Sequence, residues 1–242
     1  MNIISSASRQ IILDTETTGM NQAGGPVYIG HRIIEIGCVE VINRKLTGRT
    51  YHQYVNPGQL IDEEAIQVHG ITDERVANEP RFHQIAQDFI DFIDGAEIVA
   101  HNASFDVSFM DHEFSKLQPK GPVTKDICSI LDSLAIAKQL HPGQKNNLDA
   151  LCKRYGIDNS RRTYHGALLD AEILADVYLF MTGGQIKFNL SRDKAGQDNG
   201  VVSKLDTSGL NLKVIAASAD ELISHEQRLD LVAKSGKCLW RG

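Results

Sequence analysis

The sequence predicts an α/β fold, in which helices cover a mixed β-sheet and a flexible linker leads to a small C-terminal strand and helix. Short β-branched apolar runs come first and then alternate with amphipathic helical patterns, and the composition turns polar after Gly183. The 242 residues suffice for one sizeable domain with an appendage.

Three strands are expected near the N-terminus. The runs "RQIILDTETTGM", "HRIIEIGCVEVI" and "TYHQYV" begin at residues 9, 31 and 50, with a turn over residues 43–48. Each run is β-branched and bounded by turn-forming residues, so the three are predicted to be antiparallel neighbours in one sheet.

Helices are predicted to dominate the rest of the domain. An apolar stripe predicts a helix over residues 80–95, and a short strand follows over residues 96–102. Asn102 is placed to be the N-cap of a helix over residues 103–117. Further helices are expected over residues 126–143, 146–157 and 166–184.

The change in composition predicts three parts of the chain. They are a domain of residues 1–183, a flexible linker of residues 184–210 and a tail of residues 211–242. In the tail, "LNLKVIAA" is typical of a strand, and Ser218 with Glu221 forms a capping box before a helix.

The tail helix has a narrow apolar stripe made of Leu222, Leu229 and Val232. One strand and one helix bury too little apolar surface to be stable alone. The tail is therefore expected to order against a partner, and the alternative is that it packs on its own domain.

Composition and charge limit the function classes. The net charge of −6 argues against a broad basic surface for duplex nucleic acid, so a nucleic-acid substrate would be held locally or delivered by a partner. No apolar run approaches the ~20 residues of a membrane span, and no signal-peptide pattern opens the sequence. The four scattered cysteines are interpreted as free thiols in a reducing cytoplasm.

Asp14 and Glu16 end the first predicted strand, and the alternation of side chains along a strand places both on one face. Two neighbouring carboxylates repel each other and lose solvation, and a bound cation would offset that cost. The alternative is ordinary, because acidic residues often end a strand and cap the loop that follows.

Two later segments add acidic residues with few polar neighbours. Asp106 lies in the first turn of a predicted helix, where it could simply favour the helix dipole. Asp170 lies near the start of a strongly apolar helix, where a buried carboxylate needs a partner, and His165 comes just before it. An oxygen-rich set of this kind suits Mg²⁺ or Mn²⁺, and two such ions with a histidine base can cleave phosphodiester bonds.

The stretches "DTETTG", "AHNASFD" and "HGALLDA" together resemble the three motifs of the DEDDh class of 3′→5′ exonucleases, which have a ribonuclease H-like fold. The resemblance covers roughly residues 9–183. It implies His165 as general base and two Mg²⁺ or Mn²⁺ ions held by Asp14, Glu16, Asp106 and Asp170. It also implies that Asp14 touches both ions, Glu16 and Asp170 the ion on the side of the nucleophile, and Asp106 the other.

The segment "EEAIQVHGIT" resembles the loop with which this class contacts the terminal nucleotide. Glu64 and His69 occupy the matching positions and are expected to bind the substrate, a single-stranded or frayed DNA 3′ end, beside Asp14, Glu16 and Asp170. The alternative is a solvated glutamate on a short helix and a loop histidine.

The arrangement of domain, linker and tail resembles the proofreading subunits of bacterial replicative DNA polymerases. The resemblance implies that the tail binds the polymerase subunit, that a small third (theta-like) subunit can join the core, and that the protein works in the cytoplasm at the nucleoid. It also implies a sliding-clamp motif at Gln185, Phe188 and Leu190, whose spacing departs from the full pattern and predicts weak clamp binding.

Two other functions would use the same residues. A nuclease that trims small RNAs would have the same acidic cluster, because RNA is distinguished from DNA by contacts to the 2′-hydroxyl. An interaction protein could retain a vestigial site. The linker and tail argue against the first alternative, and the complete set of predicted catalytic residues argues against the second.

Overall fold

A computed structural model describes residues 7–160, 164–183, 217–235 and 240. The chain divides into two compact units, residues 1–187 and 188–242. The linker lies outside the described residues, and with it the predicted clamp-binding residues Gln185, Phe188 and Leu190. Most of the predicted tail strand lies outside them as well. The division into domain, linker and tail therefore stays a prediction.

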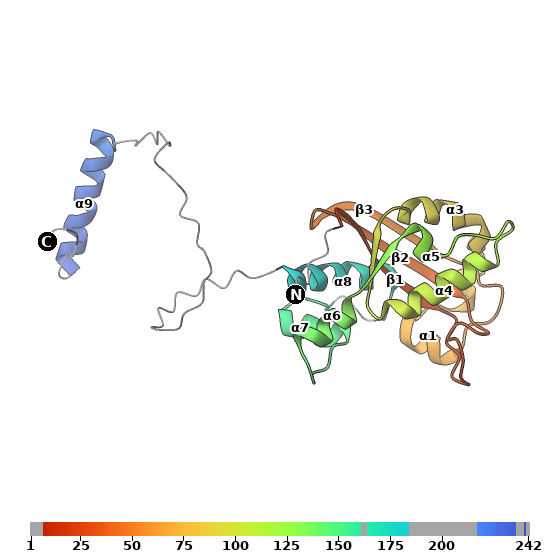
Figure 1. The fold of residues 1–242 in the computed structure, drawn as a ribbon. Helices are drawn as coiled ribbons and strands as arrows, with labels where there is room; N and C mark the ends of the chain where they lie inside the picture. Colours follow the sequence, from red (N-terminus) through yellow and green to blue (C-terminus); the bar gives the residue numbers. More distant parts are fainter. Residues whose placement is uncertain (1–6, 161–163, 184–216, 236–239, 241–242) are drawn as a thin grey trace, which may run out of the picture. The chain divides into compact units, whose positions relative to one another are not determined.

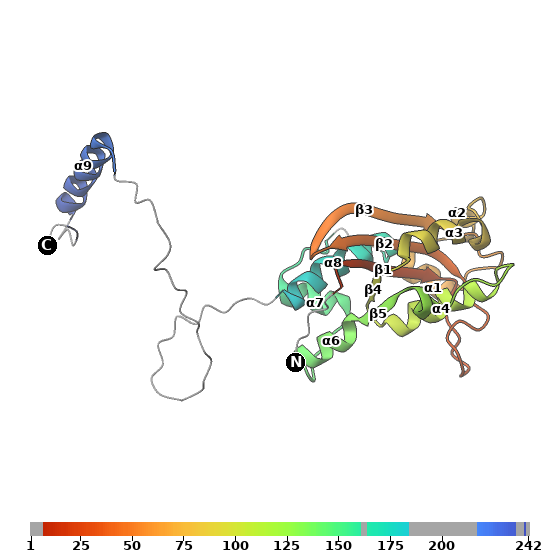
Figure 2. The ribbon, with the colours of Figure 1, turned by 45° about the horizontal axis from the view of Figure 1, so that its top comes forward.

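The first unit contains the predicted mixed sheet, which has one strand more than the sequence predicted for this domain (Figure 1). The strand order is β3-β2-β1-β4-β5, as labelled in Figure 2. β1 pairs antiparallel with β2, and β2 pairs antiparallel with β3. β4 is parallel to both β1 and β5. The strands are β1 (Arg9–Thr17), β2 (Ile33–Ile42), β3 (Lys45–Tyr54), β4 (Glu97–Ala100) and β5 (Ser129–Asp132).

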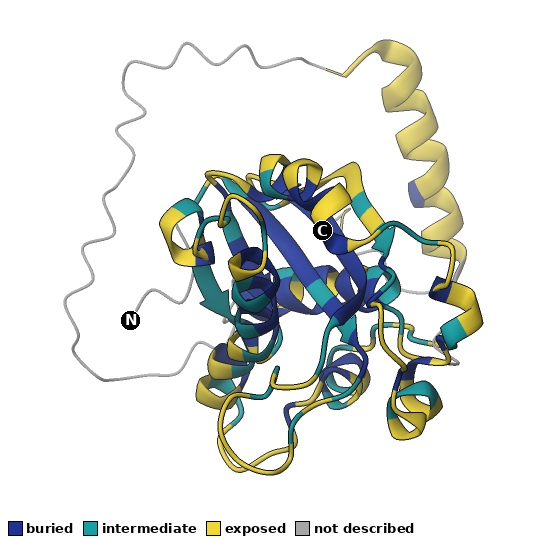
Figure 3. Ribbon diagram, turned by 90° about the vertical axis from the view of Figure 1, so that its right-hand side faces the viewer, coloured by how far each residue is buried: buried dark blue, intermediate teal, exposed yellow. Residues whose placement is uncertain are grey.

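Helices cover both faces of this sheet (Figure 2). Alternate residues of β1 enter two separate cores, because Ile11 and Leu13 face one side and Ile12 faces the other. The first core is closed by α3 (Phe82–Ile93) and α4 (Ala103–Ser115). The second is closed by α6 (Ser133–Leu140), α7 (Leu148–Tyr155) and α8 (Ala167–Thr182). Figure 3 shows buried strands between these layers, and the largely buried ones are β1, β2 and β4.

The predicted helix over residues 126–143 is wrong. This segment forms a short helix, α5 (Thr124–Ile127), then β5, then α6. Asp132 ends the strand and caps α6, because its side chain accepts a hydrogen bond from the Leu134 N–H at 2.9 Å. The pairing of β5 with β4 is a tertiary contact, which a local helical pattern cannot reveal.

Two other local expectations need correction. The turn predicted over residues 43–48 is confined to Asn43 and Arg44, both with positive φ, and β3 begins at Lys45. Asn102 does occupy the N-cap position of α4, but it has a left-handed φ of 74° and its side chain makes no capping bond.

Two short helices and the tail helix complete the described structure. The short ones are α1 (Glu63–His69) and α2 (Asp73–Val76). In the second unit, α9 (Ala219–Ser235) starts with the predicted capping box, since Ser218 and Glu221 bond each other through side chains and backbone. Among the described residues, no helix is long and apolar enough to span a membrane.

Candidate active site

β1 carries Asp14 and Glu16 to the C-terminal end of the strand. Both alternate with Leu13 and Thr15 and therefore share the face of the sheet that α8 covers. A register shift between Glu16 and Thr17 interrupts the pairing with β2 directly after the second carboxylate. Such bulges often aim side chains near functional sites.

Asp106 reaches the same end of the sheet from α4, on the opposite face. Its side chain is buried, and its Oδ1 accepts hydrogen bonds from the Thr15 N–H at 3.1 Å and the Thr15 hydroxyl at 2.8 Å. Burial raises the pKa of the Asp106 carboxyl to about 7, and the bonds from Thr15 oppose this shift. A cation next to Asp106 would favour its charged form.

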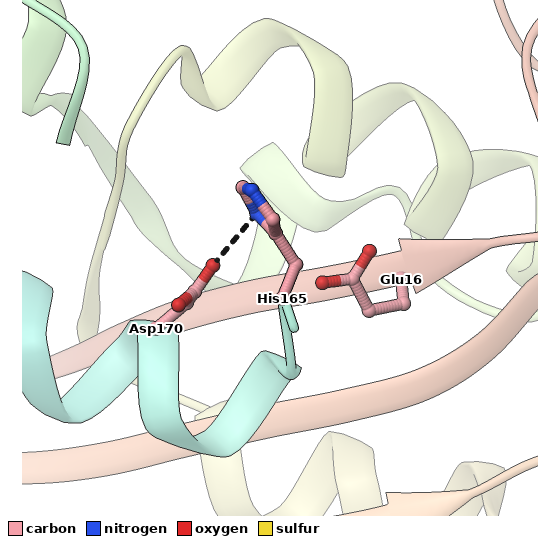
Figure 4. Close-up of side chains that lie close together, drawn as sticks. All are labelled: Glu16, His165 and Asp170. Carbon is pink, nitrogen blue, oxygen red and sulfur yellow. Dashed lines mark ion pairs between the residues drawn. The ribbon is translucent and has the colours of Figure 1, made fainter. Parts of the chain in front are cut away.

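α8 supplies the fourth carboxylate. Asp170 lies in the first turn and is only 3% exposed. Its Oδ2 is 3.2 Å from Nδ1 of His165, whose side chain is 44% exposed, and Figure 4 shows this pair beside Glu16 on β1. The backbone N–H of His165 donates to the Val68 carbonyl at 3.2 Å, so the end of α1 holds the loop that carries the histidine.

The five predicted catalytic residues line one open cavity of about 400 Å³. Ligand atoms of Glu16, His165 and Asp170 lie within 4.8 Å of one another, and Asp14 and Asp106 line the same cavity outside this tight group. The donors are mainly the oxygens of four carboxylates from three elements, β1, α4 and α8, and such a set suits a hard divalent cation. The residues present therefore fit the predicted metal ions.

A second cavity, of about 260 Å³, adjoins the first and shares Glu16 and Phe105 with it. Glu64 and His69 line this cavity, as a substrate-contacting pair would. Both ring nitrogens of His69 already meet the backbone, because Nδ1 accepts from the Ile71 N–H at 3.0 Å and Nε2 lies 3.3 Å from the Thr17 carbonyl. These contacts hold the His69 ring in place at the wall of the cavity.

Thr15 is a residue of this site that the sequence reasoning missed. Its hydroxyl and N–H both donate to the Asp106 carboxylate, and the motif pattern did not predict this role. The available signal was a polar residue in a buried strand, pointing away from Asp14 and Glu16, since buried hydroxyls need partners.

The chain is similar to known nucleases in sequence. A family described as "Exonuclease" matches residues 11–178. The chain is 52% identical to the DNA polymerase III subunit epsilon of Escherichia coli K12, over 97% of this chain and 98% of that protein. It is 54% identical to the Haemophilus influenzae subunit of the same name, over 96% of this chain and 94% of that one.

Solved structures resemble the fold. Exonuclease X in complex with 5′ overhanging duplex DNA matches with a TM-score of 0.55 and 28% identity, over 72% of this chain and 91% of that one. The nuclease domain of 3′hExo, a DEDDh family member bound to rAMP, matches with a TM-score of 0.60 over 74% of this chain and 94% of that one. At 21% identity, the second likeness concerns the fold alone.

Proposed function

Because the chain belongs to the exonuclease family, we propose that its five clustered side chains hydrolyse the terminal phosphodiester bond of a DNA 3′ end. The activity is that of a 3′→5′ proofreading exonuclease, like the DNA polymerase III epsilon subunits to which nearly the whole chain is similar. The observation that carries the residue assignment is that β1, α4, α8 and the loop before α8 bring all five side chains to one cavity.

Asp14, Glu16, Asp106 and Asp170 would hold two Mg²⁺ or Mn²⁺ ions. Bound ions of this kind activate an attacking water and stabilise the charge on the leaving oxygen. The protein's part is to hold the carboxylates in place, as Thr15 does for Asp106. The near-complete burial of Asp106 and Asp170 keeps them fixed and strengthens their attraction to a cation.

His165 acts as the general base that takes the proton of the attacking water. It is placed for this role because its imidazole is partly exposed to the cavity and its Nδ1 lies 3.2 Å from Asp170. The carboxylate orients the ring and stabilises the imidazolium that forms, in the way acidic residues support histidine bases elsewhere.

The second cavity receives the terminal nucleotide. It continues from the catalytic cavity through Glu16 and Phe105, so a strand end lying across both would place its last phosphodiester bond near the carboxylates. Glu64 can accept a hydrogen bond from the nucleotide, and apolar Val68 and Met20 line a space suited to a base or sugar.

The protein works as a subunit of DNA polymerase III, and the name that its relatives share, DNA polymerase III subunit epsilon, supports this. The tail around Leu222, Leu229 and Val232 is the docking element for the alpha subunit. Gln185, Phe188 and Leu190 bind the sliding clamp weakly, and a theta-like subunit joins the core. These events take place in the bacterial cytoplasm, at the replisome on the nucleoid.

The test uses the full chain with 5′-labelled single-stranded DNA and RNA of one sequence, in Mg²⁺, in Mn²⁺ or with chelator. The expected result is a DNA ladder that shortens from the 3′ end in single-nucleotide steps and requires the metal. Asp170→Asn serves as the inactive control. Shortening of RNA with intact DNA would contradict the proposal in favour of RNA trimming, and two intact substrates with metal present would indicate a structural role.

A further inference from the structure

Glu35 of β2 is a buried carboxylate that the proposed reaction does not use. It is 2% exposed, and both of its oxygens have partners. Oε1 lies 2.7 Å from Nε2 of His52 on β3, and Oε2 accepts a hydrogen bond from the Ala167 N–H at 3.0 Å. With both oxygens engaged, Glu35 is held away from any substrate.

The Ala167 N–H is the first of α8, and such N-terminal N–H groups have no partner within their own helix. Gly166, at the N-cap position, supplies no side-chain cap. Glu35 therefore caps α8 from a neighbouring strand, and its charge also complements the helix dipole. This bond fixes where the helix that carries Asp170 begins.

The strand register places this cap beside the metal-binding pair. Glu35 pairs directly with Glu16 across β2 and β1, and Gly37 pairs with Asp14. Directly paired residues share a face of the sheet. A Cβ at residue 37 would lie 2.2 Å from the carbonyl carbon of Ala167, so α8 starts in direct contact with the residue opposite Asp14.

We propose that Glu35 is a positioning residue for the exonuclease reaction, which fixes the first turn of α8 so that Asp170 and His165 meet Asp14 and Glu16. The inference rests on the proposed catalytic roles of these four residues. Sheet and helix supply different parts of the site, and a misplacement of about 1 Å can cost ~100-fold in rate. The bond from Glu35 to Ala167 is one of the contacts that set this distance.

Two substitutions in the full chain separate geometry from charge. Glu35→Gln keeps the length of the side chain and an oxygen that can accept from the Ala167 N–H. Glu35→Asp keeps the negative charge, but its side chain is one methylene shorter and moves the carboxylate away from that N–H. Positioning predicts that kcat on single-stranded DNA falls at least about tenfold in Glu35→Asp and less than about threefold in Glu35→Gln, with KM unchanged. The Ala167 amide should exchange faster with solvent in Glu35→Asp than in Glu35→Gln.

Glu40 provides the matched control, because it is also buried on β2 and is bonded to Arg9 at 2.8 Å. Glu40→Asp and Glu40→Gln should each leave kcat within about twofold of wild type, whatever their melting temperatures. If Glu35→Asp does not fold, His52→Ala is the variant that tests the inference. It removes the partner of Glu35 Oε1, and the His52 side chain is 34% exposed. It should lower kcat at least about threefold.

Three results would overturn the inference. The first is a greater loss of kcat in Glu35→Gln than in Glu35→Asp, which would indicate a charge effect. The second is an equal loss of kcat in the Glu35 and Glu40 variants. The third is wild-type kcat in His52→Ala, where that variant has to replace Glu35→Asp. Asp170→Asn in the same assay keeps the two proposals apart. An active Asp170→Asn protein refutes the catalytic assignment, whereas an inactive one with unaffected Glu35 variants refutes only the positioning role.

Discussion

Thr15 shows how single residues assemble this site. Its neighbours Asp14 and Glu16 point to the α8 face, while its own side chain points to the other face and bonds Asp106 of α4. The three consecutive residues Asp14–Glu16 therefore supply side chains to both faces of the sheet. The carboxylates come together because one strand end alternates its side chains between two helical layers.

The role of His165 can be tested by its effect on turnover. A general base acts on the attacking water in the chemical step and is not needed to hold the DNA. His165→Ala should therefore lower kcat by at least about 100-fold and leave DNA binding nearly unchanged. Equal loss of binding and turnover would instead make His165 a substrate contact. The measurements are steady-state kcat and equilibrium binding of DNA in Ca²⁺.

His69 makes stability depend on pH. Burial lowers the pKa of this histidine, and its Nδ1 must be unprotonated to accept from the Ile71 N–H. Because its pKa in the folded state lies below the unfolded value of about 6.5, its contribution is present above that pH and is lost as pH falls through the folded pKa.

The comparison of wild type with His69→Gln in urea, with chelator present, isolates this contribution. The difference in the free energy of unfolding between the two proteins should shrink as the pH is lowered from 8 to 5. A difference that stays constant over this range would show that His69 does not titrate with unfolding.

At the scale of elements, α1 and the loop before α8 form one structural contact. The Tyr164 ring packs on Gly70, where an added Cβ would lie 3.1 Å from the ring, and Gly70 has a left-handed φ of 70°. With the bond from His165 to Val68, this contact holds the catalytic histidine against the substrate cavity.

Tyr164→Ala removes this contact from an exposed position and should lower kcat about three- to tenfold, with a melting temperature close to wild type. Gly70→Ala should also cost about 1 kcal/mol of stability, since alanine disfavours a positive φ. Steady-state kinetics and thermal unfolding measure the two effects. Wild-type kcat in Tyr164→Ala would show that the histidine loop is held by other contacts. Tyr28→Ala, a partly buried aromatic stacked on His112, is the control.

Local sequence patterns predicted the elements that have strong periodicity. The resemblance of three motifs to a known class selected five residues, and in the structure all five line one cavity. The same patterns missed β5, because its parallel pairing with β4 is a long-range contact. They also missed Glu35 and Gly37, although an acidic residue and a glycine inside a buried strand are signals of a partner and of close approach. Which partner each meets depends on how α8 packs on the sheet.

At the scale of the whole molecule, catalysis and docking are expected to be separable. A fragment of residues 1–183 should fold and digest single-stranded DNA at about the full-length rate, because the catalytic cavity is built from residues before Gly183. The fragment should no longer bind the polymerase subunit, because it lacks Leu222, Val232 and Trp240. These side chains are exposed, and apolar anchors of this kind commonly dominate an interface.

A pull-down with the polymerase subunit, beside a nuclease assay on the same two proteins, tests this separation. In the intact assembly, docking through the tail would raise the local concentration of the nuclease near the primer end to about the mM range. A chain with a net charge of −6 needs such delivery because it lacks the broad basic surface that holds duplex nucleic acid. If the fragment binds the polymerase subunit as tightly as the full chain does, docking through the tail is refuted.

The most direct test of the catalytic account is a single-turnover rate on 5′-labelled single-stranded DNA, measured for wild type, Asp14→Ala, Asp170→Ala and the double variant at saturating Mg²⁺. If the carboxylates hold the ions as one unit, each single variant should lose about a thousandfold or more, and the double variant little beyond that, because groups that act together are not additive. Either single variant retaining more than about a tenth of the wild-type rate, or a double variant whose loss is the product of the two, would contradict the account.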